Sequence, residues 1–143
     1  MFLVNYFKYY LQNDTENKFY YLSLIKEQNK TFSIHGLWPQ YSLNSYPSFC
    51  KDVTFDINQL KPLMPQLNEL WYSNKNNNSD FWKHEYEKHG SCVFTPLTEV
   101  EYFEKTIELY NEAIKLELPE KFYDENTKKC LIPLDLNFEF KKE

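Results

Sequence analysis

The chain has 143 residues, a common single-domain size at which folding buries about two-thirds of the unfolded chain's surface. Hydrophobic residues make up 42% of the sequence and aromatic residues 19%, which excludes a disordered chain. The formal net charge of −5 excludes the strongly basic surface of non-specific nucleic-acid binders. No run reaches the roughly 20 apolar residues of a membrane span, so no membrane association is expected. We expect one globular domain over residues 1–143, with 1–18 peripheral or partly disordered.

Hydrophobic periodicity predicts the elements in chain order. Strands are expected over 19–25, over 31–34 leading into Gly36, and over 131–140. Short helices over 56–63 and 66–71, broken at Pro62 and Pro65, are followed by a polar loop over 73–80. A helix is expected over 98–116, where Thr98 and Glu101 form a capping box. Strands and helices in this irregular order indicate an α+β fold.

All three histidines and both glycines of the chain gather in two short windows. These are 32–40 (FSIHGLWPQ) and 81–92 (FWKHEYEKHGSC), which together make up about 15% of the chain, and each glycine directly follows a histidine. Chance rarely concentrates rare residues in this way, so the two windows are the candidate functional segments.

The second window is predicted to be helical, between Asp80 as an N-cap and Gly90 as a C-terminal residue. Helical geometry then gathers four polar side chains on one face: His84, Glu85, Lys88 and His89. Trp82 and Tyr86 lie on the adjoining flank and are predicted to be core residues. The alternative interpretation of the polar face is an ordinary solvated charged surface.

A metal site is not predicted at this face. The metalloprotease pattern HExxH places two histidines one helical turn apart. In this sequence Lys88 occupies the second ligand position and His89 follows it, so a cation would lie next to the metal. No metal and no other cofactor are expected. Two imidazoles with a lysine and a glutamate instead suit phosphoryl transfer, because a pKa near 6.5 lets one imidazole be neutral while another is protonated.

The two windows resemble the active-site segments of the ribonuclease T2 family, the acid endoribonucleases. The resemblance extends to YYLSL at 20–24, YPSFC at 46–50 and EYFEKTIELYN at 101–111, and is nearly continuous over 19–111. It implies a compact domain with a central antiparallel sheet flanked by helices. It also implies a monomeric endoribonuclease that acts on single-stranded RNA without a metal ion and is inactive on DNA. Such an enzyme forms 2',3'-cyclic phosphates and then 3'-phosphate ends. Its pH optimum is expected on the acid side of neutrality.

The resemblance also assigns roles to individual residues. It implies His89 as general base on the 2'-hydroxyl and His35 as general acid to the leaving group, with these roles exchanged when water opens the cyclic phosphate. It implies His84 as a phosphate contact and Glu85 and Lys88 as stabilisers of the transition state. Substrate-binding positions are implied at Trp38, Gln40, Tyr46 and Phe81. For Trp38 and Phe81 the alternative is a plain core aromatic.

The sequence departs from the family pattern in two regions. Only residues 25–30 separate the first strand from FSIHGLWPQ, so a Trp-Pro element, a base-contacting Gln and a Cys are missing, and the section after 111 is also short. Gln40 stands where many members carry Asp. A catalytically idle member kept for RNA binding or protein interaction is the alternative function, although such a protein would be expected to have lost a catalytic histidine.

Three cysteines leave one pair and one remaining thiol as the simplest arrangement. The position of Cys92 two residues beyond Gly90, together with the resemblance, favours a Cys50–Cys92 disulfide with Cys130 free. The alternative is three reduced thiols in a reducing cytosol. The resemblance implies a secreted, endolysosomal or vacuolar protein, whereas the start MFLVNYFKYY is a poor secretory signal as written.

Overall fold

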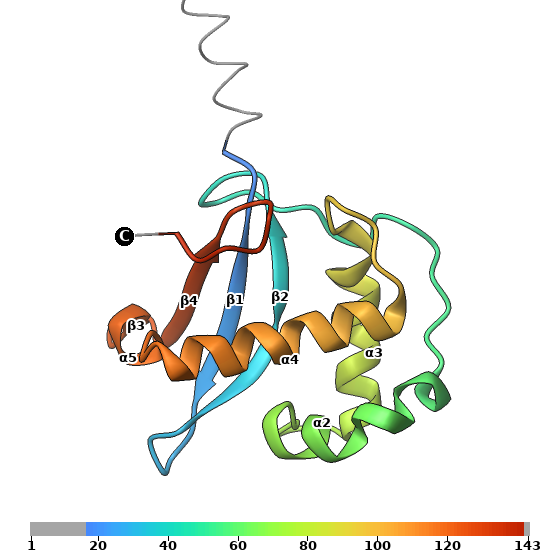
Figure 1. Cartoon of the computed structure of the whole chain (residues 1–143), viewed down its shortest axis with the longest axis horizontal. Helices are drawn as coiled ribbons and strands as arrows, with labels where there is room; N and C mark the ends of the chain where they lie inside the picture. Colours follow the sequence, from blue (N-terminus) through green and yellow to red (C-terminus); the bar gives the residue numbers. More distant parts are fainter. Residues whose placement is uncertain (1–16, 142–143) are drawn as a thin grey trace, which may run out of the picture.

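A four-stranded antiparallel sheet lies at the centre of the computed structural model, which describes residues 17–141 (Figure 1). The strands are β1 (Phe19–Lys26), β2 (Phe32–Gln40), β3 (Tyr123–Asp124) and β4 (Lys129–Leu134). Their spatial order is β2-β1-β4-β3, so the two ends of the described chain contribute the neighbouring strands β1 and β4. The α+β fold with a central antiparallel sheet is confirmed.

One face of the sheet forms the hydrophobic core. Tyr20, Leu22 and Leu24 alternate along β1 and are almost fully buried, as are Ile132 and Leu134 on β4. Successive side chains of a strand point to opposite faces, so the residues between them lie on the other face. That other face is the one on which the functional side chains gather.

Helices cover the core face and extend beyond the edge of β2. They are η1 (Ile57–Leu63), α2 (Met64–Leu70), α3 (Asn78–Lys88), η2 (Gly90–Cys92), α4 (Glu99–Lys115) and α5 (Pro119–Phe122). In Figure 1 α4 crosses the sheet, while α2 and α3 lie beside β2. The buried side chains of α4, Tyr102 and Phe103 among them, join the strand residues in one core. None of the helices within residues 17–141 has the length and apolar character that crossing a bilayer would require.

The free edge of β2 is closed by three side-chain donors. The hydroxyl of Tyr110 donates to the carbonyl of Phe32 at 2.6 Å, and the hydroxyl of Tyr102 donates to the carbonyl of Leu37 at 2.9 Å. Between them the indole of Trp71 donates to the carbonyl of His35 at 3.0 Å. These hydrogen bonds satisfy edge carbonyls that would otherwise be free to pair with a further strand, and they fix β2 against α4 and α2.

The sequence predicted several element boundaries wrongly. The second strand does not end near Gly36 but continues to Gln40, because β1 pairs with it along its whole length. The last strand runs over Lys129–Leu134 rather than 131–140, since a turn after Asp135 brings Phe140 back to Leu134. The helix predicted over 98–116 is confirmed as α4, with the Thr98–Glu101 capping box in place.

The helix of the second window begins earlier than predicted. Asn77, not Asp80, is its N-cap, and its side chain accepts a hydrogen bond from the Asp80 amide at 2.8 Å. Three residues of the predicted polar loop are therefore helical. The predicted breaks at Pro62 and Pro65 are absent, since η1 and α2 follow each other directly, with Pro62 inside η1 and Pro65 in the first turn of α2.

The prediction for residues 1–18 falls almost entirely outside the described residues. Of that segment only Asn17 and Lys18 are described, and the Lys18 ammonium lies 5.4 Å from the ring centroid of Phe94.

Candidate active site

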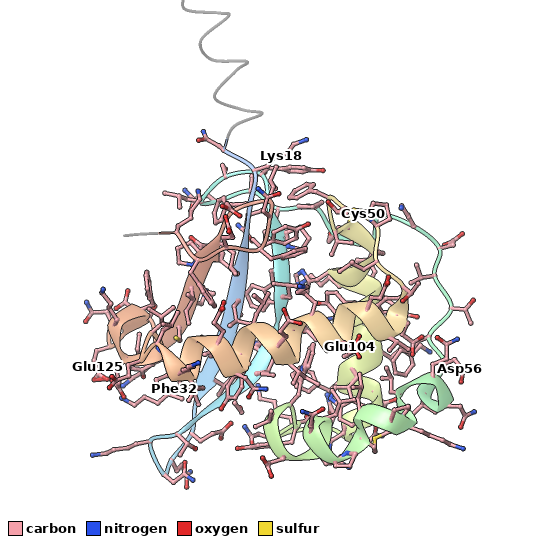
Figure 2. The ribbon with its side chains drawn as sticks, in the orientation of Figure 1. Lys18, Phe32, Cys50, Asp56, Glu104 and Glu125 are labelled. Atoms are coloured by element: carbon pink, nitrogen blue, oxygen red, sulfur yellow. A yellow bond between two sulfur atoms is a disulfide. The ribbon has the colours of Figure 1, made fainter. Side chains whose placement is uncertain are left out.

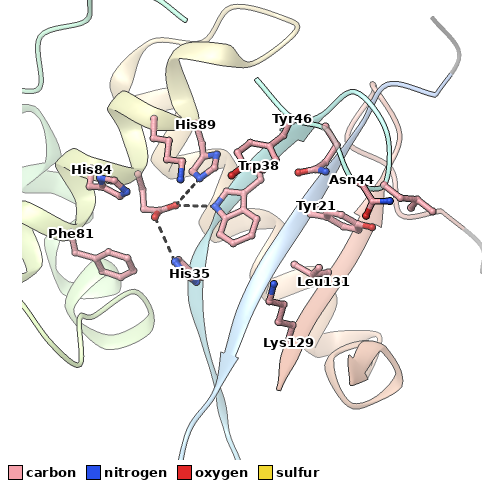
Figure 3. Close-up of a pocket in the computed structure, with 14 residues that line it drawn as sticks. Tyr21, His35, Trp38, Asn44, Tyr46, Phe81, His84, His89, Lys129 and Leu131 are labelled. Carbon is pink, nitrogen blue, oxygen red and sulfur yellow. Dashed lines mark hydrogen bonds and ion pairs between the residues drawn. The ribbon is translucent and has the colours of Figure 1, made fainter. Parts of the chain in front are cut away.

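The two sequence windows meet in one cleft of about 420 Å³ between the sheet and α3 (Figure 3). All nine polar and aromatic residues predicted for the site line it. Strand β2 contributes His35, Trp38 and Gln40, and α3 with its C-cap contributes Phe81, His84, Glu85, Lys88 and His89. Tyr46 comes from the loop that follows β2.

A β-bulge presents His35 to the cleft. Ser23 pairs with Gly36 and Leu24 pairs with Ile34, so His35 is an extra residue without a partner on β1. Bulges of this kind redirect a side chain and often lie next to active sites. The bulge is held from the other side because the Trp71 indole donates to the His35 carbonyl, and the Trp82 indole in turn donates to the Trp71 carbonyl at 2.6 Å.

Glu85 lies at the centre of the cleft. Its Oε1 accepts a hydrogen bond from the Trp38 indole at 2.9 Å, its Oε2 lies 3.6 Å from Nε2 of His35, and its Oε1 lies 4.0 Å from Nε2 of His89. Gly36 makes this approach possible, because a Cβ at Gly36 would collide with Oε1 of Glu85 and lie 2.7 Å from the Trp38 indole nitrogen. The carboxylate therefore links both strand and helix histidines.

Burial changes the acid strength of Glu85. The residue is only 2% exposed, which raises its pKa from 4.5 to about 7. The Trp38 hydrogen bond and the Lys88 charge oppose this rise but do not cancel it. The interpretation of this helix face as a solvated charged surface is therefore wrong for Glu85 and for His89, which is 5% exposed. Both side chains turn inward to the sheet, whereas His84 remains exposed at the rim.

His35 and His89 both have lowered pKa values. Burial followed by the charges of His84 and Lys88 lowers the pKa of His35 to about 4. Burial followed by the charges of Lys88 and His35 lowers the pKa of His89 to about 3. The His35 side chain is 38% exposed and the His89 side chain 6%, so His35 is the ring that solvent and substrate reach more readily.

Trp38 fixes the orientation of both rings. It stacks on His89 with ring centroids 4.9 Å apart and an interplanar angle of 23°, and it meets His35 edge-on, also at 4.9 Å. Nδ1 of His89 is buried and has no hydrogen-bond partner among the described residues. The His89 ring is therefore positioned by stacking on Trp38 and by Glu85.

The loop over 41–50 closes the outer side of the cleft and is tied to the end of α3. The amide of Phe49 donates to the Lys88 carbonyl at 2.9 Å, and the amide of Cys50 donates to the Ser91 hydroxyl at 3.0 Å. The predicted Cys50–Cys92 disulfide is present with a Cα–Cα distance of 5.1 Å, and Cys130 is free and buried (Figure 2). This anchoring brings the exposed ring of Tyr46 to 5.7 Å from the Lys88 ammonium.

Gln40 and Phe81 occupy opposite parts of the cleft wall. Gln40 is 5% exposed, and its amide donates to the Ser42 carbonyl at 3.0 Å. Phe81 is half-buried and lies 5.7 Å from the His35 ring. Both residues contribute to the wall of the cleft, and Phe81 also packs against the hydrophobic core.

The sequence did not predict five further cleft residues: Tyr21, Leu43, Asn44, Lys129 and Leu131. Alternation along the first strand could have placed Tyr21 on the open face, opposite Tyr20 and Leu22. The positions on β4 could not be predicted, because they depend on how β4 pairs with β1.

The cleft thus holds two imidazoles on either side of a carboxyl group, with an ammonium group at its edge. One ring can accept a proton while the other, once protonated, donates one, and the cationic edge favours a bound anion. Such an arrangement can catalyse phosphoryl transfer without a separate nucleophile from the protein.

Comparison with known proteins agrees with this geometry. The model of the ribonuclease T2 family matches residues 3–125. Ribonuclease DdI from Dictyostelium discoideum is 47% identical over 88 residues, which cover 60% of this chain and 40% of that protein. Ribonuclease 3 from Arabidopsis thaliana is 34% identical over 128 residues, which cover 78% of this chain and 58% of that protein.

The fold has solved counterparts as well. Ribonuclease MC1 from bitter gourd seeds superposes with a TM-score of 0.66 at 24% identity, covering 86% of this chain and 92% of that chain. A mutant of that ribonuclease has been solved in complex with 5'-UMP. The chain spans about half the length of the curated relatives it matches. With a family model matched over most of its length and the same fold, the chain belongs to the ribonuclease T2 family.

Proposed function

We propose that this protein is an endoribonuclease that cleaves single-stranded RNA by acid–base catalysis without a metal ion. The observation that carries the proposal is the placement of His35 and His89 on the two oxygens of Glu85, inside one cleft with Lys88. Membership of the ribonuclease T2 family supports the same activity.

In the first step, neutral His89 takes the proton of the ribose 2'-hydroxyl as that oxygen attacks the adjacent phosphorus. The bond between phosphorus and the 5'-oxygen of the next nucleotide breaks, and protonated His35 gives its proton to that oxygen. The products are a 2',3'-cyclic phosphate and a free 5'-hydroxyl. The roles of the two rings are assigned by the resemblance to the ribonuclease T2 family, and the geometry is compatible with them because Glu85 lies within 4.0 Å of both rings and can stabilise an imidazolium on either.

In the second step the two histidines exchange roles. Neutral His35 takes a proton from water as the water oxygen attacks the cyclic phosphate, and protonated His89 gives its proton to the departing 2'-oxygen. A 3'-phosphate end results and both rings return to their starting states. DNA is not a substrate, because it lacks the 2'-hydroxyl that attacks in the first step.

Charge in the transition state is met by the residues around the two rings. Lys88 and His84 line the cleft beside His89 and His35, where they face the oxygens of the crowded phosphorane. Glu85 supports the imidazolium that forms on either ring. Among the described residues no group of three His, Cys, Asp or Glu side chains could hold a metal ion.

Base binding is proposed at Trp38, Gln40, Tyr46 and Phe81. Stacking of a base on an aromatic ring depends little on base identity, which fits weak base preference. Tyr46 offers an exposed ring for this purpose, 49% accessible. One face of Trp38 is occupied by His89, so a base would contact its edge or its other face.

Cleavage of a single-stranded oligoribonucleotide in excess EDTA tests the proposal. The wild-type protein should cleave, and His35→Ala and His89→Ala should each retain no more than a few per cent of the rate while their circular dichroism spectra stay native. Lys83→Ala, which changes an exposed residue of α3 outside the cleft, is the matched control and should cleave normally.

The other outcomes identify other functions. Loss of cleavage in EDTA that Mg²⁺ or Zn²⁺ restores would indicate a metal-dependent phosphodiesterase. A folded wild-type protein without activity in either condition would indicate the idle RNA-binding or interaction protein.

We also propose that the protein acts as a monomer in an oxidising compartment, secreted, endolysosomal or vacuolar. The Cys50–Cys92 disulfide supports this location, because disulfides persist in oxidising surroundings and are rare in the cytosol.

A further inference from the structure

The catalytic cleft continues past the residues used in the mechanism. On the side away from α3 its wall is formed by Tyr21 of β1 and by Lys129 and Leu131 of β4 (Figure 3). Neither the acid–base steps nor the proposed base contacts employ these three side chains. Tyr21, Lys129 and Leu131 together make up what we term the sheet-face subsite.

The sheet register places the subsite directly beside the proposed base-binding residues. Tyr21 is the cross-strand partner of Trp38 on one side and of Pro133 on the other, and Ser23 pairs with Leu131. Tyr21, Trp38 and Leu131 therefore share the face of the sheet opposite the core. A chain bound at Trp38 meets Tyr21 as the next side chain across the sheet.

The subsite has the chemistry of a nucleotide contact. Tyr21 is half-buried, and Phe19 packs edge-on against its ring at 4.9 Å with an interplanar angle of 88°, which holds the ring in a defined orientation. A fixed, accessible aromatic ring next to an aliphatic side chain suits base stacking. Lys129 is exposed and forms no ion pair with any described residue, so its ammonium is available to a phosphate.

Charge in the cleft favours an anionic occupant. The chain as a whole carries a formal net charge of −5, yet the cleft is lined by two lysines and a single carboxyl group. The hollow also extends beyond Tyr21. An adjoining cavity of about 530 Å³ shares Tyr21, Leu43 and Asn44 with the cleft and is bordered by Lys141. A polyanionic strand can follow such a path across the sheet.

We propose that Tyr21, Leu131 and Lys129 form a subsite for a third nucleotide of single-stranded RNA, beyond the two that flank the cleaved bond. Tyr21 and Leu131 contact the base, and Lys129 contacts the phosphate that precedes or follows it. The inference rests on the proposed ribonuclease function. It adds that substrates longer than two nucleotides gain binding energy that a dinucleotide cannot reach.

The experiment compares a dinucleoside monophosphate with a tetranucleotide carrying the same cleaved bond. For wild-type protein kcat/KM should be higher for the tetranucleotide. In Tyr21→Ala this advantage should fall about tenfold, and in Tyr21→Phe it should be retained, because stacking needs the ring and not the hydroxyl. Lys129→Ala should reduce the slope of log(kcat/KM) against log(salt) for the tetranucleotide by about 0.7, the value for one phosphate contact on a single strand.

Lys83→Ala is the matched control, because it removes an equally exposed lysine of α3 that does not line the cleft. It should leave both the length advantage and the salt slope as in wild type. If Tyr21→Ala fails to fold, Lys129→Ala still tests the subsite. Lys129 is exposed and is the first residue of β4, so its substitution should leave the fold intact.

The outcomes separate this inference from the proposed function. Equal losses on both substrates, or no loss on either, in Tyr21→Ala and Lys129→Ala would overturn the subsite while the protein remains a ribonuclease. A wild-type protein that cleaves neither substrate would overturn the proposed function itself.

Discussion

The two carboxyl oxygens of Glu85 contact three side chains of the cleft, so the burial of Glu85 affects the whole cleft. Trp38 donates to it, and His35 and His89 lie near it from two different elements. A carboxylate removed from water is costly unless its partners compensate, and here they compensate only in part, so the pKa of Glu85 lies at about 7. The same residue therefore couples the activity of the protein to its stability.

The stability of the protein should depend on pH through Glu85. Its pKa is higher in the folded state, about 7, than the ordinary 4.5, so its contribution to stability is fully present below pH 4.5 and is lost as pH rises through 7. Glu85→Gln removes this titration. Between pH 4.5 and 8 the difference in unfolding free energy, wild type minus variant, should fall by about 3 kcal/mol, measured by urea denaturation. Differences that stay constant over this pH range would contradict the raised pKa.

The site depends on how closely β2 and α3 approach each other. Gly36 and Gly90, the only glycines of the chain, both lie at contacts where a methyl group does not fit. A Cβ at Gly36 would meet Glu85 and Trp38, and one at Gly90 would lie 2.7 Å from the Tyr86 ring. Gly90 directly follows His89, the C-cap of α3, and has no positive φ, so close packing is the reason for glycine there.

Substitution of the two glycines should separate activity from packing. Gly36→Ala displaces Glu85 or Trp38 and should lower kcat at least tenfold, with a stability loss of about 1–3 kcal/mol from overpacking. Gly90→Ala should cost a similar stability through Tyr86 and retain more activity, because Tyr86 does not line the cleft. Steady-state kinetics and thermal denaturation of both variants check this. Equal kcat values for the two variants would contradict the role of Gly36.

The proposed catalytic residues could be located from the sequence because all three histidines and both glycines of the chain lie in two short windows. Rare residues gathered in this way need no knowledge of the fold to be noticed. Positions that depend on pairing could not be predicted in this way. Lys129 and Leu131 reach the cleft only through the register of β4 on β1, and the bulge at His35 arises from a mismatch between two strands.

Local signals also competed with each other at element ends. Asn77 and Asp80 are both good N-caps, and the helix begins at the earlier one, where the Asn77 side chain bonds both the amide and the carboxylate of Asp80. The second strand was predicted to end near Gly36. Pairing with β1 and the hydrogen bonds donated by Trp71, Tyr102 and Tyr110 outweigh that local signal, and β2 continues to Gln40.

Over the whole molecule, one covalent link holds the site together. The Cys50–Cys92 disulfide joins the loop after β2 to the end of α3 across a sequence separation of 42. The segment it encloses contains η1, α2 and α3. In the unfolded chain the bond therefore restricts the same part that supplies four of the five polar positions proposed for catalysis.

Loss of the disulfide should weaken both the fold and the site. The double variant Cys50→Ala, Cys92→Ala should be less stable by about 4 kcal/mol, the chain-entropy value for a loop of this length. A reducing agent should lower the stability of the wild type by a similar amount and leave that of the double variant unchanged. Chemical denaturation with and without reductant measures both effects. A further loss on reducing the double variant would contradict the assignment of this bond.

Tryptophan fluorescence should report the protonation of the two histidines proposed for catalysis. Trp71 and Trp82 are sealed in the core, while Trp38 lies against both His35 and His89 with ring centroids 4.9 Å away. A protonated imidazole quenches indole fluorescence on contact, whereas a neutral one does so far less. Emission from Trp38 should therefore fall in acid as the two rings gain their protons, and a Trp38→Phe background would isolate the contribution of the other two. The protonation of His35 and His89 can in this way be followed by fluorescence in the absence of substrate.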